Sequence, residues 1–161
     1  MAIESGAWAP DDSFYDVVDG EYKGVRRLQD AVAQLGLDLQ DRIVTSRDPE
    51  VEPLVDLLRR PMPSGFEQWQ LPVIVGGERP ALAFITVSAA KAEVPEHSHR
   101  NDSLFRIVLA GSIFHEGVEL SVGDWMIVPA GHSYSFAAGR YGCVVLHVYH
   151  GGRFPRATPS S

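Results

Sequence analysis

Two histidines one residue apart, His97 and His99, lie in the segment PEHSHRNDS. Side chains at positions i and i+2 of a β-strand project from the same face, so the two imidazoles would point toward one place. A neutral imidazole carries a lone pair on one ring nitrogen and is a common metal ligand. The spacing therefore predicts two ligands of a metal site, and two surface histidines without a shared ligand are the alternative.

Three further side chains compete to complete such a site. His132 and Tyr134 are two residues apart, and His147 shares a strand face with Tyr149. A metal with open positions for a substrate generally uses three protein ligands on one face. A phenol, with an ordinary pKa near 10, must lose its proton to bind well, whereas an imidazole binds near neutral pH. We therefore expect His132 as the third ligand ahead of Tyr134 or His147; a hydrogen-bonded structural role is the alternative for each.

The elements that would position these residues are short strands. From Trp69 onward, apolar runs alternate with Gly, Pro, Asn and Asp, which is typical of an antiparallel sandwich or barrel. The segment EVPEHS, residues 93–98, is expected to be a turn. The expected strands are 68–75, 81–89, 103–110, 117–122, 124–130, 134–138 and 143–150.

The first third of the chain has helical periodicity instead. In residues 23–39, apolar residues recur at steps of three and four, and Gly36 would end that helix. A second helix is expected in DPEVEPLVDLLRRP, with Asp48 as its N-cap and Pro61 at its end. These amphipathic helices would pack on the barrel or on a partner subunit.

Length and composition limit the organisation and the partners. A chain of 161 residues with 45% hydrophobic content can bury one core. A net charge of −7 without a Lys/Arg cluster argues against nucleic acid as a partner. No signal peptide and no run of about 18 apolar residues is evident, and the single Cys143 fits a reducing compartment, so we expect a cytoplasmic protein without a membrane partner. The expected parts are a helical extension (1–66), a barrel (67–152) and a disordered tail (153–161).

Two segments, PEHSHRNDSLFRIVLAG and GDWMIVPAGHSYSF, resemble the paired motifs of the cupin superfamily. The resemblance covers roughly residues 69–150 and implies an all-β, double-stranded β-helix or jelly-roll barrel. It also implies that the barrel has a metal site of three histidines and a glutamate. The residues in register with the motifs are His97, His99, Gly111, Gly123, Asp124, Pro129 and Gly131.

The sequence departs from the cupin motifs at two ligand positions. Leu104 stands at the glutamate position and Tyr134 at the last histidine position, so the usual site cannot form. Cysteine-dioxygenase-like cupins bind iron with histidines alone and place a His and a Tyr two apart in a late strand, which His147 and Tyr149 resemble. That partial likeness implies that His147 and Tyr149 are catalytic, although Val145 replaces the serine of the pattern and its third histidine has no clear match here. Tyr134 is a further catalytic candidate, because its phenol could move protons beside the metal.

Arg106 is the candidate for substrate binding. If Leu104 faces inward like the glutamate that it replaces, the alternation of a strand also turns Arg106 and Val108 inward. A guanidinium inside a barrel is costly unless it meets an anion. We therefore expect Arg106 to bind an acidic group of a small substrate; an arginine that reaches the barrel edge or pairs with a carboxylate is the alternative.

These observations lead to an expected function and to two alternatives. We expect a metal-dependent enzyme acting on a small organic substrate, with Fe(II) dioxygenase chemistry favoured. A non-redox cyclase, isomerase or lyase of secondary metabolism, using zinc or nickel, is the first alternative. A small-molecule-binding or sensor barrel without turnover is the second. The resemblance to small cupins also implies a homodimer.

Overall fold

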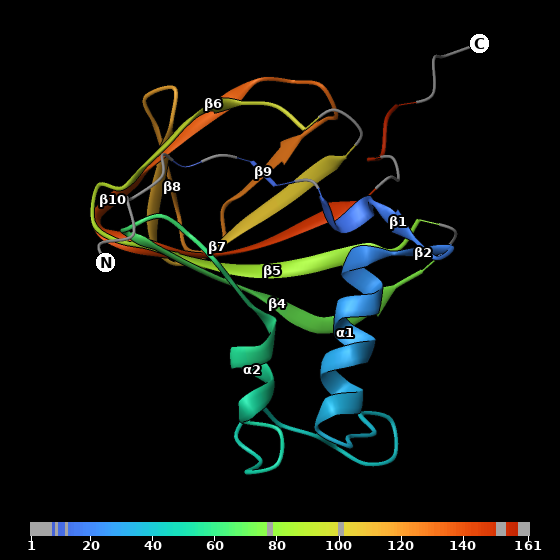
Figure 1. The fold of residues 1–161 in the computed structure, drawn as a ribbon. Coiled ribbons are helices and arrows are strands. Elements are labelled where there is room, and N and C mark those ends of the chain that lie inside the picture. Colours follow the sequence, from blue (N-terminus) through green and yellow to red (C-terminus); the bar gives the residue numbers. More distant parts are fainter. Residues whose placement is uncertain are drawn as a thin grey trace, which may run out of the picture.

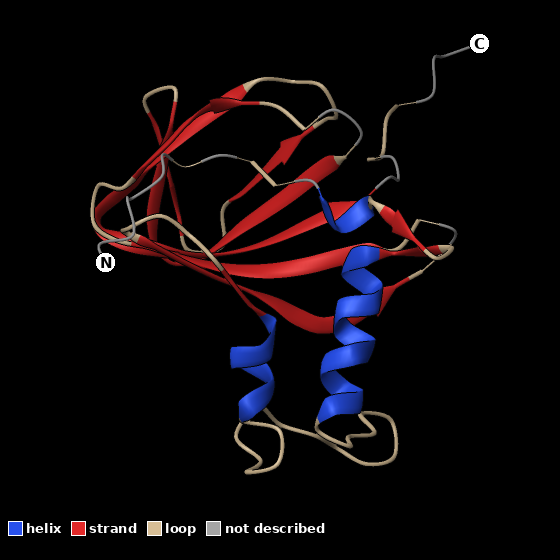
Figure 2. Ribbon diagram, in the orientation of Figure 1, coloured by secondary structure: helices blue, strands red, loops and turns tan. Residues whose placement is uncertain are grey.

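The computed structural model describes residues 8, 10–11, 13–76, 79–99, 102–150 and 154–157. Figure 2 shows that strands dominate and that two helices lie together on one side of them. The predicted tail, 153–161, lies outside the described residues except for 154–157. In chain order the elements are η1 (Ser13–Tyr15), β1 (Val17–Val18), β2 (Glu21–Tyr22), α1 (Lys23–Gln34), α2 (Pro53–Leu58), β3 (Arg59–Arg60), β4 (Phe66–Val75), β5 (Ala81–Ser88), β6 (Glu93–His97), β7 (Ser103–His115), β8 (Val118–Ser121), β9 (Trp125–Val128) and β10 (Tyr134–His150).

One antiparallel sheet of eight strands forms the body of the protein. Its order is β3-β4-β5-β10-β7-β8, with β6 paired to β10 and β9 paired to β7. Figure 1 shows that the long strands bend, so that the sheet folds over itself and encloses an interior. The predicted all-β barrel with an N-terminal helical extension is confirmed.

Two local predictions were wrong. The segment EVPEHS is not a turn, because Glu93–His97 forms β6 along the first part of β10. Pro95 is tolerated there because β6 is an edge strand. The two strands expected at 134–138 and 143–150 are one strand, β10, which pairs with β6 at its start and with β5 at its end. Their partners lie far away in the sequence, so local periodicity could not reveal either feature.

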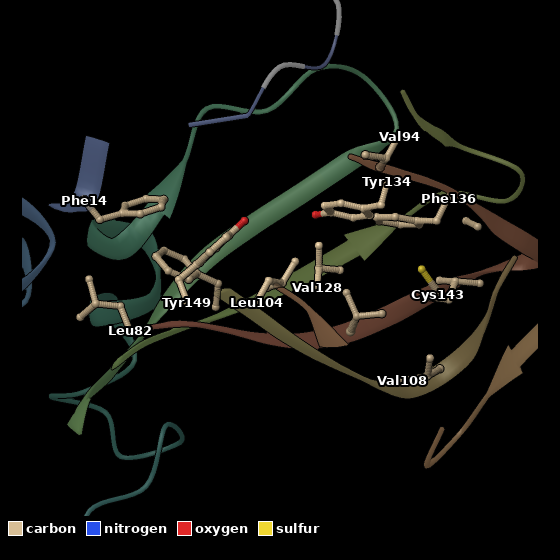
Figure 3. Close-up of a cluster of buried hydrophobic side chains, with 14 of the residues drawn as sticks. Phe14, Leu82, Val94, Leu104, Val108, Val128, Tyr134, Phe136, Cys143 and Tyr149 are labelled. Carbon is tan, nitrogen blue, oxygen red and sulfur yellow. The ribbon is translucent and has the colours of Figure 1, made fainter. Parts of the chain in front are cut away.

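The barrel interior follows the alternation expected for β7. Leu104, Arg106 and Val108 are all buried. Figure 3 shows apolar side chains from several strands meeting in this interior, with the hydroxyl groups of Tyr134 and Tyr149 turned toward each other. The interior therefore contains apolar side chains together with polar groups.

The two helices build a second, smaller core beside the barrel. Leu28 of α1 and Leu54 and Leu58 of α2 are buried together. Helix α1 ends at Gln34, and Gly36 follows with a φ of 63°, close to the predicted stop. Among the helices that the structure describes, none is long and apolar enough to cross a membrane.

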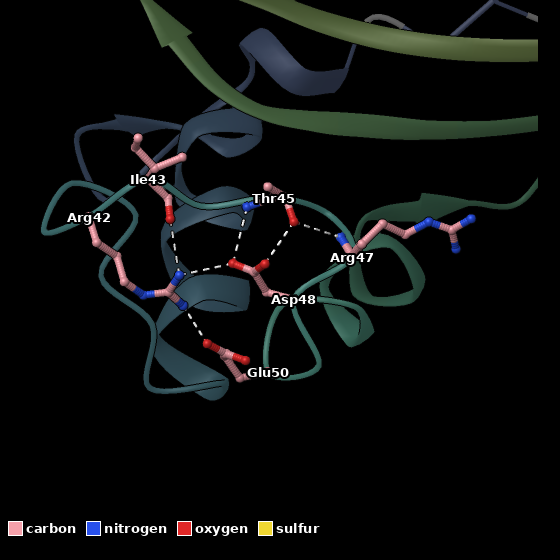
Figure 4. Close-up of polar contacts among 6 residues, drawn as sticks. All are labelled: Arg42, Ile43, Thr45, Arg47, Asp48 and Glu50. Atoms are coloured by element: carbon pink, nitrogen blue, oxygen red, sulfur yellow. Dashed lines mark hydrogen bonds and ion pairs between the residues drawn. The ribbon is translucent and has the colours of Figure 1, made fainter.

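Helix α2 is shorter than predicted because Asp48 is not its N-cap. The helix begins at Pro53, and its N-cap is Glu52. The Asp48 carboxylate instead accepts hydrogen bonds from the Thr45 hydroxyl (2.7 Å) and from the Thr45 backbone N–H (3.1 Å), and it also pairs with Arg42 (Figure 4). The Thr45 hydroxyl and Arg42 lower the pKa of Asp48 to about 2. The carboxylate therefore closes the loop between the helices.

The N-terminal segment closes one end of the barrel. The Phe14 ring is buried against Phe84, with ring centroids 4.6 Å apart. The guanidinium of Arg60 lies 4.2 Å from the Phe14 ring centroid and forms an ion pair with Asp11. The Tyr15 hydroxyl lies 2.8 Å from the Pro80 carbonyl oxygen. These contacts attach the segment before α1 to the core.

Candidate functional site

His97, His99 and Tyr134 form a compact cluster. His97 ends β6 and is the register partner of Tyr134, the first residue of β10. The ring centroids of His97 and His99 are 5.1 Å apart with perpendicular planes, and those of His97 and Tyr134 are 4.4 Å apart. The Tyr134 hydroxyl lies 3.4 Å from His99 Nε2. The predicted convergence of the two imidazoles is therefore present, and a phenol joins them.

The backbone fixes the tautomer of His97. Its Nδ1 lies 2.8 Å from the Pro95 carbonyl oxygen, so Nδ1 carries the proton that completes this hydrogen bond. The lone pair of the ring is then on Nε2, as a metal-ligating histidine requires. The Trp8 ring lies over the same imidazole, with centroids 4.3 Å apart.

A second group of polar side chains lies deeper in the barrel. Arg106 and His147 are register partners on β7 and β10, and both are buried. Nη2 of Arg106 donates to the Tyr134 hydroxyl at 3.5 Å, and this links the group to the histidine cluster. The guanidinium carbon lies 4.3 Å from the Phe136 ring centroid. The Tyr149 ring lies 5.1 Å from His99 and 5.3 Å from His147.

Gln68 fixes the orientation of His147. Arg60 donates to Gln68 Oε1, so the amide nitrogen faces the other way. That nitrogen donates to the Thr86 hydroxyl at 2.9 Å and lies 3.5 Å from His147 Nε2. Because Gln68 presents a donor, His147 Nε2 is the acceptor and Nδ1 carries the proton. The sequence analysis missed Gln68 and Thr86; their inward parity on β4 and β5 was the available signal.

Three buried donors in this group lack an acceptor. They are Nε and Nη1 of Arg106 and Nδ1 of His147, which have no hydrogen-bond partner within the described part of the chain. Burial lowers the pKa of His147 well below its ordinary value, and the charges of Arg106 and Arg60 lower it further. His147 is therefore neutral at pH 7, and the interior carries an excess of positive charge and unpaired donors.

The lowered pKa of His147 predicts that stability falls in mild acid. Below about pH 6.5 an imidazole in the unfolded chain gains a proton, while His147 in the folded protein does not. The unfolded state then binds more protons, so the free energy of unfolding decreases as the pH falls from 7 to 5. One such proton contributes at most about 1.4 kcal/mol per pH unit. Urea denaturation at each pH measures this slope.

His147→Gln and His132→Gln form the matched pair for this measurement. His132 is exposed and lies outside the buried group, so its substitution controls for the loss of a histidine elsewhere in the chain. His147→Gln should reduce the slope of the unfolding free energy against pH by up to about 1.4 kcal/mol per pH unit, which is the contribution of one proton. Equal slopes in the wild type and in His147→Gln would contradict the assignment of the slope to His147.

The structure does not bring His132 into the buried cluster. The side chain is exposed, and its Nδ1 lies 3.4 Å from the carbonyl oxygen of Ala130. Tyr134, two residues later, faces inward and contacts both histidines. β10 begins only at Tyr134. His132 precedes the strand, so strand alternation does not place its side chain on the same face as Tyr134.

The donor set fits a conventional metal site poorly. Among the residues that the structure describes, no three His, Cys, Asp or Glu side chains are grouped so as to hold a metal ion. The available set consists of the imidazoles of His97 and His99 and the phenol of Tyr134. Leu104, at the motif's glutamate position, is fully buried and offers no donor atom.

Solved structures of other proteins resemble this chain in fold. No family model and no curated protein matches the chain. An RmlC-like cupin from Shewanella frigidimarina NCIMB 400 matches with 20% identity and a TM-score of 0.48, over 59% of this chain and 84% of that chain. The fold agrees with the cupin-like barrel that the two motifs predicted. Gly111 of β7, which is in register with the first motif, lies close to the backbone of Gly142 in the neighbouring strand β10.

Two further solved structures are similar to this barrel. A chain of the complex of Rhodobacter sphaeroides SigE with the anti-sigma ChrR matches with 26% identity and a TM-score of 0.47, over 73% of this chain and 54% of that chain. The polyketide cyclase RemF from Streptomyces resistomycificus matches with 22% identity and a TM-score of 0.46, over 57% and 69%. Enzymes therefore occur among the similar structures, but these similarities assign no activity to this chain.

Proposed function

We propose that the barrel interior binds a small organic acid and that Arg106 holds its anionic group. The observation that carries the proposal is the set of three buried donors, two on Arg106 and one on His147, that have no acceptor in the described structure. A buried guanidinium costs several kcal/mol unless an opposite charge compensates it. A carboxylate supplies both the charge and the acceptors.

The surrounding side chains give the ligand a defined environment. Tyr134 accepts a hydrogen bond from Arg106, so its own O–H can donate to His99 Nε2. Phe136 and Phe84 provide apolar surface beside Arg106 and His147. Neutral His147 presents a donor without adding charge. This arrangement suits a small molecule with one acidic end and an apolar or aromatic body.

Calorimetric titration with a panel of small monocarboxylates and dicarboxylates tests the proposal. We expect at least one acid to bind, and we expect Arg106→Met to weaken its binding about a hundredfold, since hydrogen bonds to a charged group contribute about 1.5–3 kcal/mol. Arg140→Met, at an exposed position on the same strand as His147, is the control and should bind like the wild type. Absence of binding, or equal binding by Arg106→Met, would contradict the proposal.

A metal-dependent enzyme, with Fe(II) dioxygenase chemistry favoured and zinc or nickel as alternatives, is the second candidate. The perpendicular imidazoles of His97 and His99, with the lone pair of His97 on Nε2, favour it. The missing third imidazole, carboxylate or thiolate among the described residues opposes it. Because the donor set fits poorly, the binding of an organic acid remains the better supported function.

Metal analysis after anaerobic loading with iron, zinc or nickel tests this second candidate. This candidate requires about one ion per chain in the wild type, and loss of that ion in His97→Ala and His99→Ala. Loss in Tyr134→Phe with retention in His132→Ala would make the phenol the third ligand, and the reverse pattern would make it His132. Oxygen uptake by the iron form separates the dioxygenase from the non-redox alternatives. Failure of the wild type to retain any of the three metals would rule out the candidate.

A further inference from the structure

The N-terminal segment lies across the barrel interior. The Trp8 ring contacts the His97 ring, with centroids 4.3 Å apart, where β6 ends. The Phe14 ring lies 5.8 Å from the ring of Tyr149, and Figure 3 shows it at one end of the core. We call the described residues among 8–15 the N-terminal strap. The strap thus extends from the histidine cluster to the far end of the interior.

Phe14 fills a space the size of one ring in the barrel core. It is only 5% exposed, and it belongs to the buried cluster of the barrel rather than to that of the helices. Its ring centroid lies 4.6 Å from that of Phe84 and 4.2 Å from the guanidinium carbon of Arg60. The rings of Phe84 and Tyr149 also lie beside His147, with centroids 5.6 and 5.3 Å from its ring. Phe14 therefore occupies a place close to a buried donor, His147 Nδ1, that lacks an acceptor in the described structure.

Asp11 brings a carboxylate to the same guanidinium that contacts Phe14. The side chain of Arg60 is 9% exposed and that of Asp11 is 49% exposed, so the carboxylate reaches a buried cation from the solvent side. Burial lowers the pKa of Arg60, and the negative charge of Asp11 offsets part of this effect. Asp11 and Phe14 together present a carboxylate and a phenyl ring to Arg60, and an aromatic carboxylic acid has the same two groups.

Two guanidinium groups act on the region around His147. Burial lowers the pKa of His147, and the charges of Arg106 and Arg60 lower it further. Gln68 connects the second of them to the imidazole, because its Oε1 accepts from Arg60 and its Nε2 lies 3.5 Å from His147 Nε2. An acid bound beside His147 would be attracted by both cations, and its negative charge would repel the Asp11 carboxylate. The acid and the strap would therefore oppose each other.

We propose that the N-terminal strap occupies part of the binding site of an aromatic carboxylic acid, which binds by displacing Phe14 and the Asp11 carboxylate. The ring of the acid takes the place of the Phe14 ring beside Arg60, and its carboxylate extends toward Arg106. This inference rests on the proposed binding of an acid in the interior, and it adds the chemical class of the acid and a competing segment of the chain. Only chains with an open strap bind, so the apparent affinity falls in proportion to the fraction of open chains.

Calorimetric titration with phenylacetate and phenylpropanoate tests the competition. Asp11→Asn keeps the oxygen that accepts a hydrogen bond from the Ser13 N–H but removes the charge that pairs with Arg60. It should open the strap more often and tighten acid binding about fivefold, the scale of one ion pair. Asp19→Asn also removes one negative charge and breaks an exposed ion pair, that with Arg26, so it is the matched control and should bind like the wild type. Hexanoate, an acid without a ring, should bind at least about tenfold more weakly than phenylacetate.

Hydrogen exchange measures whether the strap opens when the acid binds. The Ser13 N–H donates to Asp11 Oδ1 at 2.9 Å, and the Asp16 N–H donates to the Ser13 carbonyl oxygen at 3.0 Å. Displacement of the strap should expose both amides, so phenylacetate should speed their exchange in the wild type. Asp11→Asn should speed the same exchange without any ligand. A strap that closed over the bound acid would slow the exchange instead.

The outcomes separate this inference from the proposed function. Phenylacetate that binds through Arg106 but leaves exchange in the strap unchanged, or slows it, would overturn the competition while the acid site stands. Binding by Asp11→Asn that is no tighter than binding by Asp19→Asn, with circular dichroism showing both variants folded, would overturn it as well. Hexanoate binding as tight as that of phenylacetate would contradict the aromatic class. If no acid binds to the wild type or to Asp11→Asn, the proposed function itself fails, and the competition fails with it.

Discussion

Replacing Gly111 by alanine should remove most of the stability of the barrel. Gly111 has a φ of 67°, which costs a residue with a side chain about 1 kcal/mol. A Cβ at this position would also lie 2.0 Å from the carbonyl oxygen of Gly142. Backbone must then move, which costs about 1–3 kcal/mol or more. The sum, about 2–4 kcal/mol or more, is a large part of the stability of a marginal domain. Urea denaturation followed by tryptophan fluorescence measures it.

Gly123→Ala is the matched control for this prediction. Gly123 has a φ of 89°, but a Cβ there would meet no atom within 4 Å. Its substitution should therefore cost only the conformational strain, about 1 kcal/mol. Equal losses in the two variants would show that the close approach of Gly111 to Gly142 does not limit stability.

Replacing Arg106 by methionine should stabilise the protein when no ligand is present. The guanidinium is only 4% exposed, and two of its three nitrogens lack acceptors within the described structure. Methionine retains an apolar body of similar length and removes the buried charge. Contacts of the cation with Phe136 and Tyr134 offset part of the gain, by about 2 kcal/mol. Replacement of buried charges by apolar groups commonly stabilises by about 1–4 kcal/mol, so after this offset we expect a net gain of up to about 2 kcal/mol.

The same variant should lose the ability to bind an acid, so stability and binding change in opposite directions. Functional sites often carry such a cost in stability. Thermal unfolding of the wild type, Arg106→Met and Arg140→Met without ligand provides the comparison. Arg140 is exposed and stacks on Tyr141, so its substitution should change the melting temperature little. A marked loss of stability in Arg106→Met would mean that the arginine is a structural residue whose ring contacts outweigh its desolvation.

Local periodicity determined the parts of the protein that depend only on near neighbours in the chain. The inward direction of Leu104, Arg106 and Val108 follows from the two-residue repeat of a strand, and burial agrees with it. The same repeat predicted that His97 and His99 converge. The three- and four-residue steps after Lys23 similarly predicted α1.

Only the tertiary structure decided what depends on distant partners. Glu93–His97 is a strand because β10 pairs with it, and Tyr134 rather than His132 reaches the histidines because β10 begins at Tyr134. The lack of acceptors around Arg106 and His147 likewise arises from strands that are far apart in sequence. The sequence alone determined which side of a strand each residue faces. The pairing of strands that are distant in sequence decided which residues meet on the inner face of the barrel, and which charged groups have no partner on that face.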